Sequence, residues 1–317
     1  MADGRPTKGG AGAGGSRAVV YVALAGNVLV AASKFVAAGV TGSSALLTEA
    51  VHSSADTTNQ ILLIVGGRRS RAPADGTHAF GYGMEIYFWT SMVAVLVLLA
   101  GGAVSLVDGW LHLRSPRPID SPLVSLGVLV LSAVFEGTSF LFGLRAYRRM
   151  TARHEAPDED VGVWAFIKRS KDPNLYESLL EDGAALIGLA LAAAGVLLSA
   201  YAGAPWADGA ASIAIGAMLV ADAYVIMAAT RSLTAGETVA PAFHAALERA
   251  LAERHAVLGT SRIDTLHLGP EAVLVALSIS PPESLSLPDL RREMADVRRD
   301  LVRVDERVRF LQFRFDD

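Results

Sequence analysis

Residues 41–60, TGSSALLTEAVHSSADTTNQ, place a histidine and an aspartate four positions apart inside a long apolar stretch. Four residues is about one helical turn, so His52 and Asp56 project from the same helix face, where a divalent cation could bridge them. Thr48 and Gln60 continue this spacing and make a polar stripe along that face. Ionisable groups in a membrane segment are costly and usually mark an ion pathway, so this pair is the leading candidate for a functional site.

The overall composition indicates an integral membrane protein. The 317 residues are 52% hydrophobic with a mean hydropathy of +0.38, which is too apolar for an ordinary soluble protein of this length. Six segments are each close to the length of about 20 residues that crosses a bilayer core. They are residues 19–40, 44–66, 87–111, 123–144, 175–200 and 210–229. We therefore expect an all-α transmembrane domain of six helices in a lipid bilayer.

Charge and cysteine content restrict the possible partners and chemistry. The formal net charge is −4, so the chain lacks the basic surface that binds nucleic acid, and no nucleic acid partner is expected. It contains no cysteine, which excludes disulfides, zinc–thiolate sites and thiol nucleophiles. A metal site in this protein must therefore use imidazole and carboxylate ligands.

The positions of lysine and arginine predict how the chain crosses the membrane. Basic residues gather in residues 1–17, 68–71 and 145–171, whereas the connections on the other side contain only Arg114 and Arg117. By the positive-inside rule, both termini are cytoplasmic. Residues 1–17 are Gly-rich and have neither the apolar region of a signal peptide nor a clear transit peptide. This favours a flexible arm and the inner membrane of a bacterium.

From about residue 233 the sequence takes on the pattern of a small cytosolic domain. The expected order is helix, strand, strand, helix, strand, at residues 241–255, 262–268, 273–279, 287–302 and 307–315. This order predicts an α+β domain of the ferredoxin-like kind over residues 233–317, with helices on one face of a sheet. The expected domains are thus the arm, 1–17, the transmembrane domain, 18–232, and this cytosolic domain.

The fifth apolar segment supplies further candidate ligands, because a tetrahedral site needs about four. Residues 173–186, PNLYESLLEDGAAL, place Glu181 and Asp182 about two turns into a helix. The predicted topology makes this helix antiparallel to the second one, with Asp56 and Asp182 at similar depth. Acids are costly to bury in lipid, so we expect Asp182 foremost, and then Glu181, to join His52 and Asp56 around a metal.

Three other acids in the apolar segments are further candidates for a role in the site or in the packing of the helices. Glu136 could lie on the ion path or could hydrogen-bond a neighbouring helix. Glu49 lies one turn before His52 and could flank the polar stripe. Asp208 begins the last segment, where we expect its carboxylate to cap the helix N-terminus.

Three motifs together resemble the cation diffusion facilitator family, in the branch that is similar to mitochondrial-type zinc transporters. They are GSSALLTEAVHSSAD from Gly42, HAFGYGMEIYFW from His78 and LLEDGAAL from Leu179. The resemblance covers nearly the whole chain from about Arg17. It implies a homodimeric antiporter that moves a divalent cation, most often zinc, out of the cytosol in exchange for protons.

The resemblance also implies a set of ligands. In the family pattern, two ligands four apart on the second helix meet two ligands four apart on the fifth. These positions are His52 and Asp56, and Ser178 and Asp182. Serine replaces the usual His or Asp at position 178, so Glu181, Glu136 or a water molecule could complete the site, and Glu181 would require a rotated helix.

An accessory site of some family members is incomplete in this sequence. Asp75 and His78 match two of its ligand positions, but Tyr82 stands where a second histidine is needed. The alternative for His78 is a hydrogen-bonded loop residue. In the cytosolic domain His267 lacks the partners of a binuclear site, and we expect it to be structural, like His244 and His255.

The chemistry of the candidate ligands favours transport over the alternatives. An imidazole, with an ordinary pKa of about 6.5, must lose its proton to bind a metal and can regain it on release. One imidazole with carboxylates favours zinc over magnesium, while manganese, iron and cobalt remain alternatives. No prosthetic group and no enzymatic activity are expected, because the sequence offers no separate general base for an intramembrane metalloenzyme. A membrane metal sensor or scaffold without transport is the other alternative.

Overall fold

The computed structural model describes the backbone of residues 12–154 and 173–316, and the side chains considered below belong to residues 24–145, 148 and 179–316. The chain forms two compact units. Within the described residues, the first unit comprises residues 12–62, 93–154 and 177–225, and the second comprises residues 63–92, 173–176 and 226–316.

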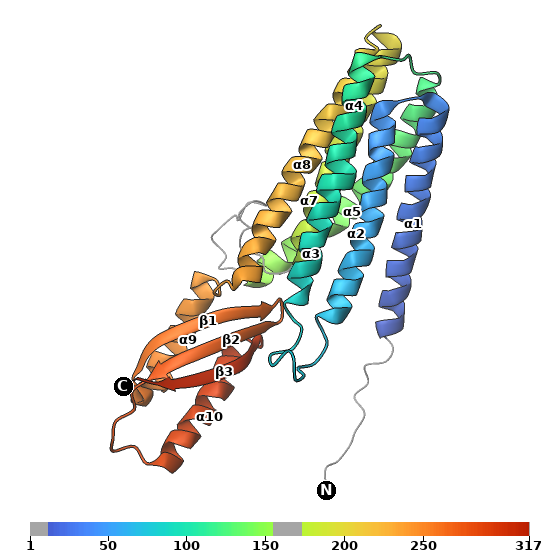
Figure 1. Cartoon of the computed structure of the whole chain (residues 1–317). Helices are drawn as coiled ribbons and strands as arrows, with labels where there is room; N and C mark the ends of the chain where they lie inside the picture. The colour runs from blue at the N-terminus through green and yellow to red at the C-terminus, as the bar shows by residue number, and fades with distance from the viewer. Residues whose placement is uncertain (1–11, 155–172, 317) are drawn as a thin grey trace. The chain divides into compact units, whose positions relative to one another are not determined.

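Long helices make up most of the chain (Figure 1). They are α1 (Gly12–Thr41), α2 (Ser44–Arg69), α3 (Glu85–Leu96), α4 (Val104–Arg114), α5 (Pro122–His154), α7 (Pro173–Tyr201) and α8 (Trp206–Ala235). A π-helical stretch, η1 (Val97–Ala103), joins α3 to α4, so these three form one continuous rod. Each of the six apolar segments predicted from the sequence therefore lies in a helix.

Five helical stretches among the described residues are long and apolar enough to cross a membrane. They are Leu24–Thr41, Glu85–Arg114, Pro122–Arg145, Leu179–Tyr201 and Trp206–Ala235. Helix α2 is of spanning length but is not among them, because its polar stripe, which includes Glu49, His52 and Asp56, lowers its hydropathy. These three polar side chains are nevertheless buried, so the polar stripe of α2 faces the interior of the helix bundle.

Glycines bring α4 and α8 into backbone contact. A Cβ atom added to Gly109 would lie 2.8 Å from the carbonyl oxygen of Gly209, and one added to Gly209 would lie 3.0 Å from the carbonyl oxygen of Gly109. Gly216 makes a similar approach to the backbone of Leu106. Small residues allow this spacing between membrane helices, and any larger side chain at these positions would separate the pair.

The C-terminal part of the chain contains a three-stranded sheet and two helices. Its elements are α9 (Pro241–Arg254), the short 3₁₀ helix η2 (Ala256–Leu258), β1 (Thr260–Gly269), β2 (Ala272–Ile279), α10 (Leu287–Val304) and β3 (Val308–Phe315). The strand order is β1-β2-β3, with β1 antiparallel and β3 parallel to β2. Helices and strands follow one another in the predicted order, helix, strand, strand, helix, strand. In the described residues, this is the order of a ferredoxin-like domain with its first strand left out.

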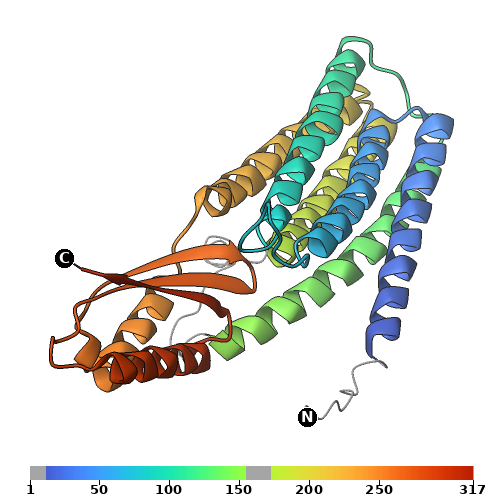
Figure 2. The same ribbon diagram turned by 60° about the horizontal axis from the view of Figure 1, so that its bottom comes forward.

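The core of this part lies between the sheet and its helices. Figure 2 shows α9 and α10 on the same face of the sheet. Val273, Val275, Leu277 and Ile279 alternate along β2 and are fully buried, as the period of two in a strand requires. The remaining buried members are Val239, Leu247, Leu251, Leu258, Val297, Leu301 and Val308.

Candidate metal centre

His52 and Asp56 form a buried pair on one face of α2. Their side chains are 1% and 11% exposed, and 3.3 Å separates His52 Nδ1 from Asp56 Oδ1. Both ring nitrogens of His52 and Oδ1 of Asp56 lack a hydrogen-bond partner among the described residues. Two atoms that bind one tetrahedral zinc ion lie about 3.3 Å apart. The spacing and the unpaired atoms therefore fit a shared metal cation.

Glu181 of α7 contacts Asp56 of this pair. The carboxyl groups of Asp56 and Glu181 share a hydrogen bond. Glu181 Oε1 also accepts a hydrogen bond of 2.8 Å from the side-chain amide of Asn59. A hydrogen bond between two carboxyl groups requires a proton on one of them, since an ionised carboxylate only accepts. A proton shared by these two carboxyl groups would lie between α2 and α7, where a cation that binds Asp56 must also lie.

Asp182 faces a different helix. Its Oδ2 accepts a hydrogen bond of 2.8 Å from Ser139 of α5. Successive residues of a helix point about 100° apart, so Glu181 and Asp182 cannot face α2 equally well. Glu136, also on α5, interacts electrostatically with both Asp56 and Asp182. The side chain of the other predicted ligand, Ser178, lies outside the described residues.

The predicted ligands are thus brought together only in part. His52 contacts Asp56, and Asp56 contacts Glu181. Asp182 and Glu136 lie near enough to interact with this chain of contacts electrostatically. Within the described part of the chain, no group of three or more His, Asp or Glu side chains is close enough to hold a metal ion. A full coordination shell would require a shift of α7 or a contribution from water.

Glu49, which we expected to flank the polar stripe, forms an ion pair with Lys34 of α1. Lys34 Nζ lies 3.3 Å from Glu49 Oε2, and both side chains are completely buried. Lys34 also donates a hydrogen bond of 2.6 Å to Ser53 Oγ. The sequence shows a lone lysine in an apolar segment, but it does not show which acid it meets.

Asp208 caps a helix other than its own. Its carboxylate accepts hydrogen bonds from Ser43 Oγ at 2.7 Å and from the backbone amides of Ser44 and Ala45 at 2.5 and 3.4 Å. These amides are at the N-terminus of α2, whereas Asp208 is near the start of α8. Asp208 thus lies in the first turn of α8 and caps a helix N-terminus, but the helix that it caps is α2, because tertiary packing brings a second helix N-terminus to its carboxylate.

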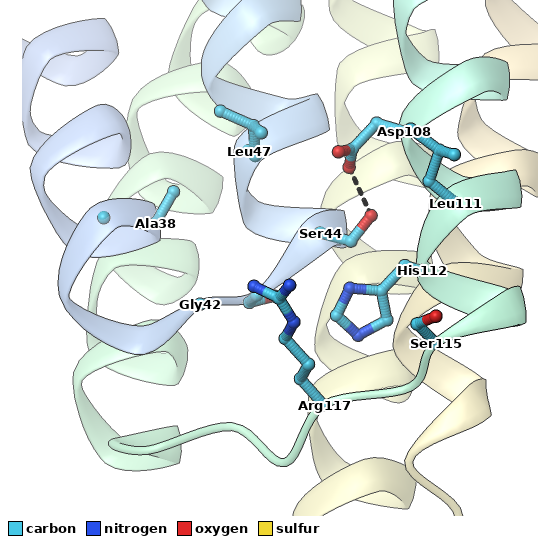
Figure 3. A pocket seen from close by; sticks show the side chains of 11 residues that line it. Ala38, Gly42, Ser44, Leu47, Asp108, Leu111, His112, Ser115 and Arg117 are labelled. Carbon is cyan, nitrogen blue, oxygen red and sulfur yellow. Dashed lines mark hydrogen bonds between the residues drawn. The ribbon is translucent and has the colours of Figure 1, made fainter.

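A pocket of about 340 Å³ opens where α1 turns into α2 (Figure 3). Asp108 of α4 accepts a hydrogen bond from Ser44 Oγ on one side of it. His112, one turn further along α4, also lines it, and its Nε2 lies 3.8 Å from Asp208 Oδ2. Thr48 and Ser212 join α2 to α8 by a further hydroxyl hydrogen bond. Polar contacts thus close α2 against α4 and α8 at this end of the bundle.

The loop after α2 is organised by Asp75. Its carboxylate accepts hydrogen bonds from the amide and hydroxyl of Thr77, the amide of His78 and the hydroxyl of Tyr82. Hydrogen bonds from Tyr82, Thr77 and the His78 amide hold the pKa of Asp75 well below its ordinary value. The ring of His78 stacks on Tyr82 with centroids 3.9 Å apart. These contacts fit the alternative interpretation, in which His78 is a hydrogen-bonded loop residue.

The histidines of the C-terminal part have protein partners. His255 Nδ1 lies 2.7 Å from Glu293 and its Nε2 lies 3.3 Å from Asp300. His244 Nε2 lies 3.1 Å from the carbonyl oxygen of Ile263. His267 is buried on β1. These positions fit the structural roles expected from the sequence.

Comparison with known proteins gives a consistent result. The family described as the cation efflux transmembrane domain matches residues 20–233. The human proton-coupled zinc antiporter SLC30A9, mitochondrial, is 32% identical over 224 residues, which are 70% of this chain and 38% of the human protein. Metal tolerance protein C4 of Arabidopsis thaliana is 33% identical over 206 residues, or 64% of this chain and 44% of the plant protein. Magnetosome protein MamM of Magnetospirillum gryphiswaldense is 34% identical over 124 residues, or 36% of this chain and 38% of MamM.

Each alignment covers less than half of the relative's length. The family match nevertheless includes the whole of α2 and α7, which carry His52, Asp56, Glu181 and Asp182. It describes a class of transporters and not a class of enzymes. From this match, the helices of spanning length and the buried polar stripe, it follows that the chain belongs to the cation efflux family of membrane proteins.

Proposed function

We propose that this protein exports a divalent cation, zinc foremost, from the cytosol in exchange for protons. The observation that carries the proposal is the buried pair of His52 and Asp56, whose unpaired atoms lie at the separation that a bound zinc ion requires. The printed names of two relatives, a proton-coupled zinc antiporter and a metal tolerance protein, support the same activity. The cation is the substrate of this site, and no prosthetic group is proposed.

Proton exchange has a direct physical basis at this site. The hydrogen bond between Asp56 and Glu181 contains a proton that a cation must displace before it can bind Asp56 fully. The imidazole of His52 must likewise be neutral to act as a ligand. Metal and protons therefore compete for the same groups, and the cation leaves when protons return from the other side of the membrane.

Glu181 and Asp182 are the proposed sources of the third ligand. Glu181 already contacts Asp56, whereas Asp182 needs α7 to rotate by about 100°. Two positions of α7 thus offer two ligand sets, and alternating access would exchange one for the other. Ser178 and Glu136 are accessory residues in this proposal, and water completes the shell. One imidazole with carboxylates favours zinc, with manganese, iron and cobalt as the alternative substrates.

The proposed arrangement in the membrane includes α2 as a sixth span, shielded by its apolar neighbours. Both termini are cytoplasmic, following the distribution of lysine and arginine. Residues 18–232 form the transmembrane domain, residues 233–317 form the cytosolic domain that holds a homodimer together, and residues 1–17 form the arm. The host membrane in this proposal is a bacterial inner membrane.

The test is zinc flux into proteoliposomes that contain the purified full chain under an imposed pH gradient. We expect flux with the wild-type protein and a loss of at least about tenfold with Asp56→Asn, which removes a charged ligand. Asp264→Asn is a matched control, because that carboxylate is exposed and paired with Arg262 in the C-terminal part.

Two results would contradict the proposal. Normal flux with Asp56→Asn would show that the pair on α2 is not the site. Zinc binding by the wild-type protein without any flux would instead indicate a membrane metal sensor. Elution of each variant at the wild-type volume on a sizing column checks that the loss of flux is not a loss of folding.

A further inference from the structure

Lys34 is an isolated positive charge in the interior of the bundle. It is the only lysine or arginine between Arg17 and Arg68 in the sequence, and its side chain is completely buried. Its ammonium group lies 3.3 Å from Glu49 Oε2 and donates a 2.6 Å hydrogen bond to Ser53 Oγ. A buried charge is costly even when paired, and an ionisable group inside a membrane segment usually has a function.

The ammonium group lies beside the proposed cation site. Its two partners flank His52 on α2, since Glu49 precedes His52 by three positions and Ser53 follows it directly. The charge of Lys34 acts electrostatically on His52, Asp56 and Glu136. Like charges repel strongly where water is excluded, so this group opposes a cation bound between His52 and Asp56.

Close packing holds the partner of Lys34 in place. Glu49 Oε1 has no hydrogen-bond partner among the described residues and lies against Gly188 of α7. A Cβ atom at position 188 would make this oxygen shift, so the glycine leaves room for the carboxylate at its present position. The carboxylate is therefore confined beside Lys34 and neutralises part of its charge.

We propose that Lys34 sets the affinity of the cation site. Its fixed positive charge repels the cation and weakens binding enough for release. The carboxylate of Glu49 determines how strong this repulsion is. This inference rests on the proposed function, because it assumes that a cation binds at His52 and Asp56. Lys34 is a positioning residue and not a ligand, since an ammonium group has no lone pair to donate.

The test is zinc binding to the purified full chain in detergent, measured by titration calorimetry at one pH. Lys34→Met removes the opposing charge, and we expect about tenfold tighter binding and slower turnover in proteoliposomes. Glu49→Gln leaves Lys34 unneutralised, and we expect about tenfold weaker binding. The double variant should fall between the two single variants. Arg69→Met is the control, because it removes a positive charge at an exposed position of α2, the helix that carries Glu49.

A purely structural role predicts a different result. Loss of a structural ion pair would alter both single variants in the same direction, or would lower their stability without changing affinity, and either outcome would overturn the inference. If a single variant does not fold, the double variant decides the question. Lys34 acts electrostatically on both His52 and Asp56, so the double variant, which lacks both charges, should bind zinc more tightly than the wild type. Equal or weaker binding would contradict the proposal.

The inference and the proposed function fail in different ways. A wild-type protein that neither binds nor transports zinc, manganese, iron or cobalt would refute both. A wild-type protein that transports zinc, but whose affinity does not move in opposite directions in Lys34→Met and Glu49→Gln, would refute only the role of Lys34.

Discussion

The imidazole of His52 affects which metal ion the proposed site prefers. An imidazole nitrogen is a softer ligand than a carboxylate oxygen and favours zinc, whereas sites made only of oxygen atoms lean toward manganese. His52 is the one nitrogen ligand among the candidate residues of α2 and α7 whose side chains are described. The metal preference of the proposed site therefore depends on a single residue.

His52→Asp is expected to reduce the preference for zinc over manganese by about tenfold, the effect of about 1.4 kcal/mol. Competition between the two ions for binding to the purified protein measures this ratio. His244→Gln is a suitable control, since His244 bonds a backbone carbonyl in the C-terminal part. An unchanged ratio would mean that His52 does not contact the bound metal.

The proton shared by Asp56 and Glu181 should be visible in the pH dependence of binding. A cation that binds Asp56 must release this proton, so the apparent zinc affinity of the wild type rises as the pH rises. Glu181→Gln cannot share an acidic proton, and the slope of log affinity against pH is expected to fall by up to about one proton per cation. Titration calorimetry in buffers of different ionisation enthalpy counts the released protons. An equal count in both proteins would contradict the proton's assigned position.

At the level of the helix, the start of α2 depends on a residue far along the sequence. The first amides of a helix have no partner within it, and here the carboxylate of Asp208 accepts from Ser44 and Ala45. The negative charge also lies at the positive end of the helix dipole. The helix that carries the candidate ligands is thus fixed at one end by α8.

Asp208→Ala is expected to destabilise the protein by about 1–2 kcal/mol, the effect of losing a helix cap. The thermal midpoint of the purified protein in detergent measures the loss. Asp208→Asn keeps one accepting oxygen and should be milder. A midpoint that stays at the wild-type value in Asp208→Ala would show that solvent or another side chain satisfies these amides.

For the molecule as a whole, the sequence predicted what depends on local pattern. The helices, the order of elements after residue 240 and the buried stripe on α2 all follow from hydrophobic periodicity. The stripe was recognisable because polar residues recur every four positions in an otherwise apolar segment. Asn59 was missed as a partner of Glu181, although it lies close to Asp56 along α2 and could have been included.

The relative rotation of helices could not be predicted in the same way. Helix α7 is apolar on most of its surface, so its pattern does not state whether Glu181 or Asp182 faces α2. The contact of Asp208 with α2 joins residues 164 positions apart and depends on packing alone. The partner of Lys34 was open for the same reason, since several acids lie at suitable depths. These are tertiary choices that no local sequence pattern encodes.

The backbone contact of Gly109 with Gly209 decides which helices can move separately. Close contact between the two backbones leaves little room for side chains to rearrange, so we expect α4 and α8 to move together. Helix α2 is held to this pair of helices at its start, by the hydrogen bonds of Ser44 and Thr48 and by those that Asp208 accepts. We therefore expect the rest of α2 to move relative to α4 and α8 about this fixed end, and any motion that opens the cation's path should leave the distance between α4 and α8 constant.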